Sequence, residues 1–383
     1  MNSNDKAFLL RSLDLARSWE GFTGENPPVG AVLVKGNKVL SEAVHRGSGK
    51  PHAEREAIRK AISRFGASAV KGATLYVSLE PCSSWGRTPP CTEIIKNTCI
   101  KRVVFGSWDP NPKNRKGVLS LLKEGIKLDW PRGNLAKEFK RFYRPFDVFI
   151  NQKRPFVIVK IAQTLNGFIV DKNGQAKWIT SPKTRRLVHC RLRRRVSGLM
   201  TGIGTILADD PQLNVRGVGQ KNVLLRIILD PELKTPIESQ VLKNSNKMLP
   251  VLILVSEQVA EKRIRSFISS LKDKGGIVQI LKMKEREQKL NLYDVLKEVG
   301  RRMNGMYLLV EAGPRLVSDL FRCQLVDRLV VCISKSIIGA GRTWLELEEV
   351  GLQNRLRLES RIMEDLGEDI WVEFDVCWDN KTH

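Results

Sequence analysis

The feature that most limits how this chain can fold is a set of three metal-ligating side chains near its N-terminus. His52 begins a His-Ala-Glu triplet, Cys82 follows Pro81, and Cys91 lies nine positions further on. Zinc favours tetrahedral coordination by nitrogen and sulfur, and a catalytic site supplies three protein ligands so that water occupies the fourth position. Any fold of this chain must therefore bring three separated segments to one point.

Two other interpretations of the same residues remain open, a structural zinc site and a His with two Cys that bind no metal. A structural site normally has a fourth protein ligand. The sequence contains no second Cys-x-x-Cys pair and no His-x-x-x-His pair to supply one. The residues therefore favour a catalytic metal.

Glu54 indicates which kind of reaction this centre catalyses, because it follows His52 by two residues. One His, two Cys and a nearby Glu that is not a ligand are typical of zinc-dependent nucleobase deaminases. Zinc lowers the pKa of a bound water to about 7, which makes hydroxide available at neutral pH. The Glu54 carboxylate could take the proton of that water and pass it to departing ammonia. We interpret the centre as a deaminase site.

Length and composition indicate a multidomain chain of the cytoplasm. The 383 residues correspond to two or three domains at about 150 residues each. No apolar run reaches the roughly 20 residues that span a bilayer, and no signal peptide opens the sequence. Seven cysteines, an odd number, fit a reducing compartment better than a disulfide framework. We therefore expect a cytoplasmic enzyme without a membrane partner.

The net charge of +24 points to an anionic partner. Such a field attracts nucleic acid, an anionic membrane surface or phosphorylated small molecules. The basic residues are scattered along the chain apart from Arg185-Arg186 and the run 191–195, and no RNA-binding signature accompanies them. We expect a phosphorylated small molecule and no nucleic acid.

Alternating apolar patterns predict two α/β domains. In the first 130 residues we expect strands at 29–34, 38–44, 73–79 and 102–105, and helices over 52–65 and after Cys91. The pattern breaks around residues 140–155, and we place the boundary between domains 1–147 and 148–383. Beyond it we expect strands at 156–162, 224–229, 251–255, 277–281 and 307–310, and helices over 182–195 and 257–271. Strands that alternate with helices indicate a largely parallel sheet.

Several longer motifs resemble one enzyme family, the bifunctional riboflavin-biosynthesis deaminase/reductases. In the first half these are 26–30 (Asn-Pro-Pro-Val-Gly), 51–54, 79–83, 86–91 (Gly-Arg-Thr-Pro-Pro-Cys) and 109–112. In the second half they are Lys160, 164–167, 178–180, 202–205, 207–211 (Leu-Ala-Asp-Asp-Pro), Leu213, Arg216 and 311–314. The resemblance covers nearly the whole chain, and the motifs at 86–91 and 207–211 are the most specific.

The resemblance implies two consecutive reactions and two folds. A cytidine-deaminase-like α/β/α domain would use Zn²⁺ to deaminate a diaminohydroxyphosphoribosylaminopyrimidine. A dihydrofolate-reductase-like α/β domain would then reduce the ribosyl group to ribityl with hydride from NADPH. Family enzymes are often homo-oligomers, and the sequence does not decide that state.

The resemblance also implies roles for individual residues. His52, Cys82 and Cys91 would ligate zinc, Glu54 would shuttle protons, and Asn26 would contact the pyrimidine. Lys160 would assist at the reducing centre. The cofactor site would comprise Thr164, Thr180, Thr205, Asp209, Gly313, Pro314, Arg315 and Leu316. The substrate side would comprise Trp178, Arg195, Leu213, Arg216 and Glu311. Plainer interpretations are a solvated face for Arg195, a core or rim position for Trp178, and a simple corner at Gly313-Pro314.

Five positions depart from the family pattern. Ser84 stands where a His is usual, Asn166 where an Asp is usual, Val196-Ser197 where Ser-Asp is usual, and Pro231 where a Ser often meets the cofactor. These departures motivate a second hypothesis, a deaminase whose C-terminal half is a scaffold without reductase activity. A third hypothesis, a basic deaminase of RNA bases, leaves the second domain unexplained.

Overall fold

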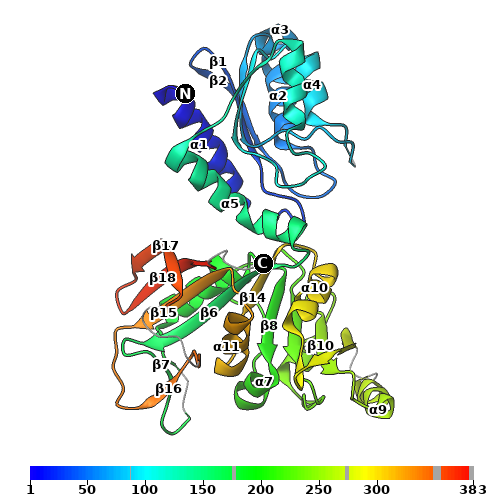
Figure 1. Cartoon of the computed structure of the whole chain (residues 1–383), viewed down its shortest axis with the longest axis vertical. Coiled ribbons are helices and arrows are strands. Elements are labelled where there is room, and N and C mark those ends of the chain that lie inside the picture. Colours follow the sequence, from blue (N-terminus) through cyan, green and yellow to red (C-terminus); the bar gives the residue numbers. More distant parts are fainter. Residues whose placement is uncertain (87, 175–177, 272–275, 348–354, 379–383) are drawn as a thin grey trace. The chain divides into compact units, whose positions relative to one another are not determined.

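The computed structural model describes residues 1–86, 88–174, 178–271, 276–347 and 355–378. Arg87, part of the motif at 86–91, therefore lies outside the described residues. The chain divides into two compact units, Met1–Lys153 and Arg154–His383 (Figure 1). None of the described helices combines the length and the apolar character that a bilayer crossing needs.

The first unit is built on a five-stranded sheet in the order β2-β1-β3-β4-β5. Its strands are β1 (Gly30–Lys35), β2 (Lys38–Val44), β3 (Thr74–Leu79), β4 (Arg102–Ser107) and β5 (Lys127–Asp129). The predicted hairpin is confirmed, because β1 pairs antiparallel with β2 and Lys35 lies opposite Lys38. β3, β4 and β5 run parallel to one another. β3 and β4 therefore end at the same edge of this mixed sheet.

Helices cover both faces of this sheet. They are α1 (Ser3–Ser18), α2 (Ala53–Phe65), α3 (Ala67–Val70), α4 (Cys91–Asn97), the 3₁₀ segment η1 (Gly117–Glu124) and α5 (Gly133–Asn151). α1 and α5 lie on one face, and α2 and α4 lie on the other (Figure 1). α1 approaches β1 so closely that a Cβ on Gly30 would meet the Ser12 carbonyl oxygen at 2.1 Å. The layers give the α/β/α arrangement that the resemblance implied.

An ion pair at the start of α1 ties this helix to the sheet. Arg102 donates to both carboxylate oxygens of Asp5, at 2.7 and 2.9 Å, and the Tyr76 hydroxyl donates to Asp5 at 2.7 Å. Arg102 and Tyr76 come from neighbouring strands, so one buried carboxylate holds three elements. Hydrogen bonds to an ionised group are the stronger kind.

The boundary between the units differs from the one expected at 147/148, which falls inside α5. Pro145 lies within this helix and does not end it. The sequence around Pro145 was interpreted as a break because proline removes one helical hydrogen bond. Here the buried faces of Phe142, Phe146 and Val148 keep the helix in place. The units divide between Lys153 and Arg154.

The second unit contains a nine-stranded sheet in the order β11-β10-β9-β8-β14-β6-β15-β18-β17. Its strands are β6 (Phe156–Thr164), β8 (Gly198–Gly202), β9 (Leu225–Leu229), β10 (Val251–Ser256), β11 (Val278–Met283), β14 (Tyr307–Val310), β15 (Arg328–Ser334), β17 (Arg357–Asp365) and β18 (Asp369–Cys377). The strands from β11 to β15 are parallel, and β18 and β17 complete the sheet in antiparallel fashion. The predicted parallel sheet is confirmed, and the antiparallel strands after residue 334 were not predicted.

The helices of this unit connect the parallel strands. They are α6 (Pro182–Leu187), the π-helical segment η2 (Val188–Arg193), α7 (Ile203–Asp209), α8 (Gln240–Lys243), α9 (Glu261–Leu271), α10 (Leu292–Arg302) and α11 (Pro314–Arg322). Short two-stranded sheets pair β7 (Phe168–Asp171) with β16 (Gly341–Thr343) and β12 (Glu285–Arg286) with β13 (Lys289–Leu290). Strands covered on both faces read as continuous apolar runs, and β14 and β10 are buried throughout. This is why the apolar runs in the sequence predicted the positions of β14 and β10 well.

A buried ion pair fixes β6 against β15 at the entry to this unit. Arg154 donates to both oxygens of Asp327, at 2.6 and 3.0 Å. The backbone N–H of Val157 donates to the same carboxylate at 2.8 Å. The pair therefore sets the register from which Lys160, further along β6, reaches the cavity described below.

Candidate active sites

Three segments of the first unit converge on one group of ligand atoms, formed by His52, Cys82 and Cys91. These atoms all lie within 4.8 Å of one another. The Nδ1 atom of His52 is 3.4 Å from each of the two sulfurs. A tetrahedral zinc with standard bond lengths would separate nitrogen from sulfur by about 3.6 Å. The donor set and its spacing therefore fit a zinc ion bound through Nδ1.

Helix ends and a strand end place these ligands. His52 is the N-cap of α2 and Cys91 is the first residue of α4. Cys82 follows the end of β3 after Pro81, and its sulfur accepts a hydrogen bond from the Cys91 backbone N–H at 3.3 Å. Backbone N–H groups at a helix start carry partial positive charge, which favours the thiolate. Hydrogen bonds with Cys91 and His52 accordingly hold the pKa of Cys82 below its ordinary value.

Glu54 lies beside these ligands and is almost completely buried, with 4% of its surface exposed. Burial raises the pKa of Glu54 to about 7, against the lowering effect of His52. A carboxyl group whose pKa lies near neutrality can both accept and release a proton at working pH. The structure therefore places a carboxyl group of nearly neutral pKa beside the three ligand atoms, and Glu54 is not one of the group that could hold the metal.

His45 is a member of this site that sequence reasoning missed. The Asn26 side-chain amide lies 3.2 Å from His45 Nε2, and His45 Nδ1 lies 3.1 Å from the Pro51 carbonyl oxygen. Its ring also meets the His52 ring edge to face at a centroid separation of 5.2 Å. The only sequence signal was a histidine seven residues before His52. His45 orients Asn26, which the resemblance placed at the pyrimidine.

Ser84, the position that departs from the family pattern, is held in a polar network. Its hydroxyl donates to the Asn114 side-chain oxygen at 2.5 Å, and Asn114 Nδ2 donates to Asp109 at 3.0 Å. Glu80 accepts the Asp109 backbone N–H at 3.0 Å. The loop after Cys82 is thus tied to the loop after β4 by hydrogen bonds.

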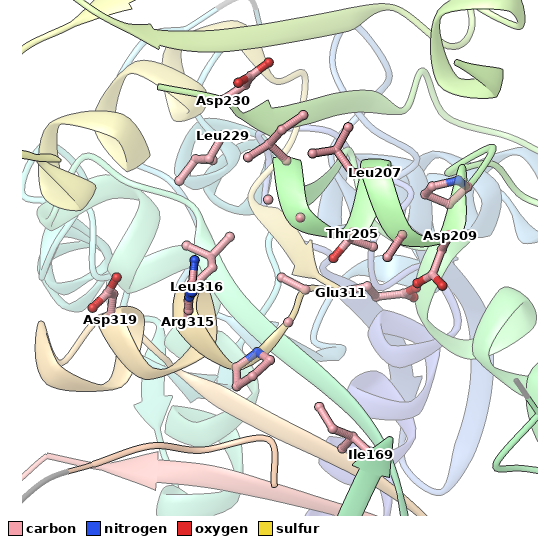
Figure 2. A pocket seen from close by; sticks show the side chains of 18 of the residues that line it. Ile169, Thr205, Leu207, Asp209, Leu229, Asp230, Glu311, Arg315, Leu316 and Asp319 are labelled. Atoms are coloured by element: carbon pink, nitrogen blue, oxygen red, sulfur yellow. The ribbon is translucent and has the colours of Figure 1, made fainter. Parts of the chain in front are cut away.

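The second unit contains a cavity of about 2180 Å³ beyond the carboxyl ends of its central strands. Figure 2 shows it between α7, the end of β9 and the start of α11, with Thr205, Leu229 and Leu316 facing the space from different elements. Ligands of open α/β sheets bind at this edge. Sites for one small ligand occupy about 300–1,000 Å³. The volume is therefore large enough for a dinucleotide together with a substrate.

Most of the predicted reductase residues line this cavity. Of the residues predicted for the cofactor these are Thr180, Thr205, Asp209 and the turn formed by Gly313, Pro314, Arg315 and Leu316. Of those predicted for the reducing centre and the substrate they are Lys160, Trp178, Leu213, Arg216 and Glu311. Gly313 is the N-cap of α11 and Pro314 its first residue, so the free N–H groups of a nine-residue helix face this region.

Two predicted residues, Thr164 and Arg195, are not among those that line the cavity. The Thr164 hydroxyl donates to Asn166 Oδ1 at 2.8 Å and accepts from the Phe168 backbone N–H at 3.1 Å, so it builds the turn after β6. Arg193, and not Arg195, lines the cavity, so the substrate-side role predicted for Arg195 stays a prediction. The bond from Arg194 N to His189 O spans five residues, and this π-helical turn changes which arginine faces inward.

Arg193 forms a buried ion pair with Glu311 at the cavity wall. The side chains are 12% and 16% exposed, and Arg193 donates to the two Glu311 oxygens at 3.1 and 2.5 Å. Although burial opposes ionisation, the Arg193 guanidinium lowers the pKa of Glu311 to about 2. Lys160 also acts on this carboxylate through its charge. Glu311 is therefore an anion at every working pH.

Comparisons with known proteins place both units in one family. The model of the RibD C-terminal domain matches residues 155–372. The model of the cytidine and deoxycytidylate deaminase zinc-binding region matches residues 2–107. The riboflavin biosynthesis protein RibD of Aquifex aeolicus (strain VF5) is 38% identical over 371 residues, covering 97% of this chain and 98% of that protein. The chain belongs to the RibD family.

Other relatives agree with this assignment. The RibD protein of Escherichia coli (strain K12) is 33% identical over 338 residues, 88% of this chain and 89% of that one. A solved deaminase/reductase from Thermotoga maritima superimposes with a TM-score of 0.81 at 31% identity, covering 98% of this chain and 99% of that one. The predicted fold class, a cytidine-deaminase-like domain followed by a RibD reductase domain, is confirmed. The zinc-binding region supports Zn²⁺, and the reductase domain implies NADPH.

Proposed function

We propose that this RibD-family chain catalyses two consecutive steps on one phosphorylated pyrimidine. The first is hydrolytic deamination of diaminohydroxyphosphoribosylaminopyrimidine in the first unit. The second is NADPH-dependent reduction of the resulting 5-amino-6-(5-phosphoribosylamino)uracil in the second unit. The relative from Thermotoga maritima is described as acting on these two compounds. The net charge of +24 suits a phosphorylated substrate.

In the deaminase unit, we assign the metal to the Nδ1 atom of His52 and the sulfurs of Cys82 and Cys91. Zinc in this position supplies the Lewis acidity that makes water a nucleophile at neutral pH. Glu54 takes the proton of the attacking water and returns it to the leaving amine, for which a pKa of about 7 is suitable. Asn26, oriented by His45, binds the edge of the pyrimidine.

In the reductase unit, the proposed cofactor is NADPH, which supplies hydride when bound. Its phosphates would meet the N–H groups at the start of α11, after Gly313. Arg216 would grip the phosphate of the substrate, since its fork of donors suits phosphate geometry. Glu311 and Lys160 place one negative and one positive charge on the wall where the ribosyl group would react.

One observation carries the proposal, the convergence of three zinc-binding atoms beside a buried carboxyl group of nearly neutral pKa. A coupled assay tests it. The purified chain receives zinc, NADPH and the diaminopyrimidine phosphate, and ammonia release and NADPH oxidation are followed separately. We expect ammonia first and NADPH oxidation only after it. No ammonia with zinc bound would refute the deaminase, and ammonia without NADPH oxidation would favour the scaffold hypothesis.

The site-residue roles are tested separately by Cys82→Ser. The variant should lose zinc and deamination together because one of three ligands is removed. Reduction of the deaminated intermediate supplied directly should continue, which serves as the internal control. Full zinc retention in this variant would contradict the ligand assignment.

A further inference from the structure

The loop from Asp209 to Arg216 runs along the substrate side of the cavity with an unusual backbone. Asp210 and Leu213 have φ values of +42° and +47°, in the left-handed region. For residues other than glycine this conformation costs about 1–2 kcal/mol and persists only when the surroundings hold it. Leu213 and Arg216 both line the cavity. Contacts from neighbouring elements must therefore hold the loop in this conformation.

Three side chains tether the loop at alternate residues. Arg226 on β9 donates to the Gln212 carbonyl oxygen at 3.1 Å, and Arg193 on η2 donates to the Asn214 carbonyl oxygen at 2.9 Å. His189 on η2 accepts the Arg216 backbone N–H at its Nδ1 atom, at 3.0 Å. The last tether differs from the others, because here the side chain is the acceptor.

His189 can act as this acceptor only while Nδ1 carries no proton. The ring is 9% exposed and is surrounded by the charges of Arg193, Arg216 and Lys160, which oppose protonation, and of Glu311, which favours it. Burial and the two arginines lower the pKa of His189 to about 4. The ring is therefore neutral at working pH, with its proton on Nε2.

The guanidinium of Arg216 remains available to a ligand. The residue is exposed and forms no ion pair within the described part of the chain. Its backbone N–H is the group that His189 holds, so the ring sets the point from which the Arg216 side chain extends into the cavity.

We propose that His189 is a positioning residue of the reductase, which holds the Arg216 backbone so that the guanidinium meets the substrate phosphate. This inference rests on the proposed function and assigns a residue that the sequence did not indicate. His189 touches neither substrate nor cofactor in this role. It acts through Arg216 and therefore affects substrate binding more than the chemical step.

Steady-state kinetics of two variants test the proposal. His189→Leu removes the acceptor and leaves the Arg216 N–H without its partner, so KM for the aminouracil substrate should rise about tenfold. The kcat should stay within about twofold, and deamination by the same protein should not change. His189→Asn places an amide oxygen at the same position along the side chain as Nδ1 and should recover most of the loss. An unchanged KM in a folded His189→Leu variant would overturn the proposal.

A double-mutant cycle separates positioning from general destabilisation. Arg216→Gln removes the phosphate contact, so His189→Leu should have no further effect on KM in that background. Additive effects of the two substitutions would show that His189 does not act through Arg216. Thermal unfolding of each variant identifies any loss of the fold. If the leucine variant is unstable, His189→Gln carries the test, because its amide oxygen lies one bond beyond the Nδ1 position and KM should again rise.

Nuclear magnetic resonance of the imidazole nitrogens gives a readout that does not depend on activity. The chain has four histidines, and His189→Gln identifies the signal of this one by its disappearance. We expect an Nε2–H tautomer with Nδ1 unprotonated, unchanged from about pH 8 to pH 6 because of the lowered pKa. A protonated Nδ1 would refute the tether even if the wild-type chain reduced nothing. Absence of reduction with the expected tautomer would refute the proposed function instead.

Discussion

The two candidate sites are built in opposite ways. The deaminase site gathers His52, Glu54, Cys82 and Cys91 from fewer than 50 consecutive positions, and its ligand atoms lie within 4.8 Å of one another. The reductase site is a cavity of about 2180 Å³ whose lining residues are spread from Lys160 on β6 to Glu346. The deaminase site is a compact cluster of ligand atoms, and the reductase site is an extended cavity wall.

This difference determines how each site tolerates change. At a metal centre every ligand is needed for the geometry, so the chemistry fails when one is removed. A cavity wall distributes binding over many contacts, and most single changes there have modest effects. The exceptions should be groups that are buried and charged, such as Glu311 with Arg193.

Replacement of Glu54, the proposed proton carrier of the deaminase, should have the largest effect. Glu54→Gln removes general acid–base catalysis and should lower deamination by at least about 10²-fold and up to about 10⁴-fold. Zinc content, measured by elemental analysis, should be unchanged because Glu54 is not among the three ligand atoms. Loss of zinc from this variant would mean that the compact site has a different ligand set.

Disruption of the buried ion pair should be the most costly change in the reductase unit. Arg193→Ala leaves the Glu311 carboxylate buried without its partner, which typically costs about 3–5 kcal/mol. Chemical unfolding of the second unit measures this loss. Arg195→Ala is the comparison variant, and because Arg195 does not line the cavity, KM for the reductase substrate should stay unchanged. A rise in KM equal to that of Arg193→Ala would support the predicted substrate-side role of Arg195.

Removal of the cavity lysine should damage one reaction alone. Lys160 lies on β6 and lines the cavity beside Glu311. Lys160→Ala should lower reduction by about 10²-fold, the usual loss when one charge-stabilising group is removed. Deamination, measured as ammonia release, should not change. An equal fall in both activities would show that Lys160 does not belong to the reductase site alone.

The smallest effect concerns the stability of the first unit. The Arg102 guanidinium holds the pKa of the Asp5 carboxyl well below its usual range, assisted by the Tyr76 hydroxyl and opposed by burial. Asp5→Asn should therefore lower the free energy of unfolding by about 1–3 kcal/mol at neutral pH. Because the folded-state pKa is depressed, the contribution is complete above the ordinary value of about 4 and is lost as the pH falls below it.

Unfolding titrations of the first unit at several pH values would check this pH dependence of the Asp5 contribution. The difference between wild type and Asp5→Asn should be constant from about pH 7 to pH 5 and shrink in stronger acid. A difference that grew with acidity would contradict the sign of the shift. Reduction should be unaffected by this substitution, since Asp5 lies in the other unit.

Much of the deaminase site could be predicted because each of its parts has a local cause. His52 and Cys91 stand at helix starts, and Cys82 follows a strand whose end is marked by Pro81. His45 escaped notice because a lone histidine carries no signal until the fold brings it to Asn26 and His52. The roles of nucleic acid and of self-association stay predictions.

The reductase site was harder to predict because a cavity wall depends on helix phase and on distant packing. Arg193 lines the cavity where Arg195 was expected, which follows from one π-helical turn that no residue type specifies. Thr164 closes a turn with Asn166 and Phe168 and does not line the cavity, so its predicted contact with the cofactor stays a prediction. The units divide at Lys153/Arg154 and not at 147/148, because α5 continues through Pro145 to Asn151 with its apolar face buried.

The sequence by itself determined the chemistry of the metal centre, the parallel α/β architecture and the family, because motifs and apolar periods are local properties of the chain. Only the tertiary structure decided which arginine faces the substrate cavity and that His189 holds the Arg216 backbone. Those choices depend on distances between residues far apart in sequence, and such distances exist only once the sheet has been assembled and its helices packed against it.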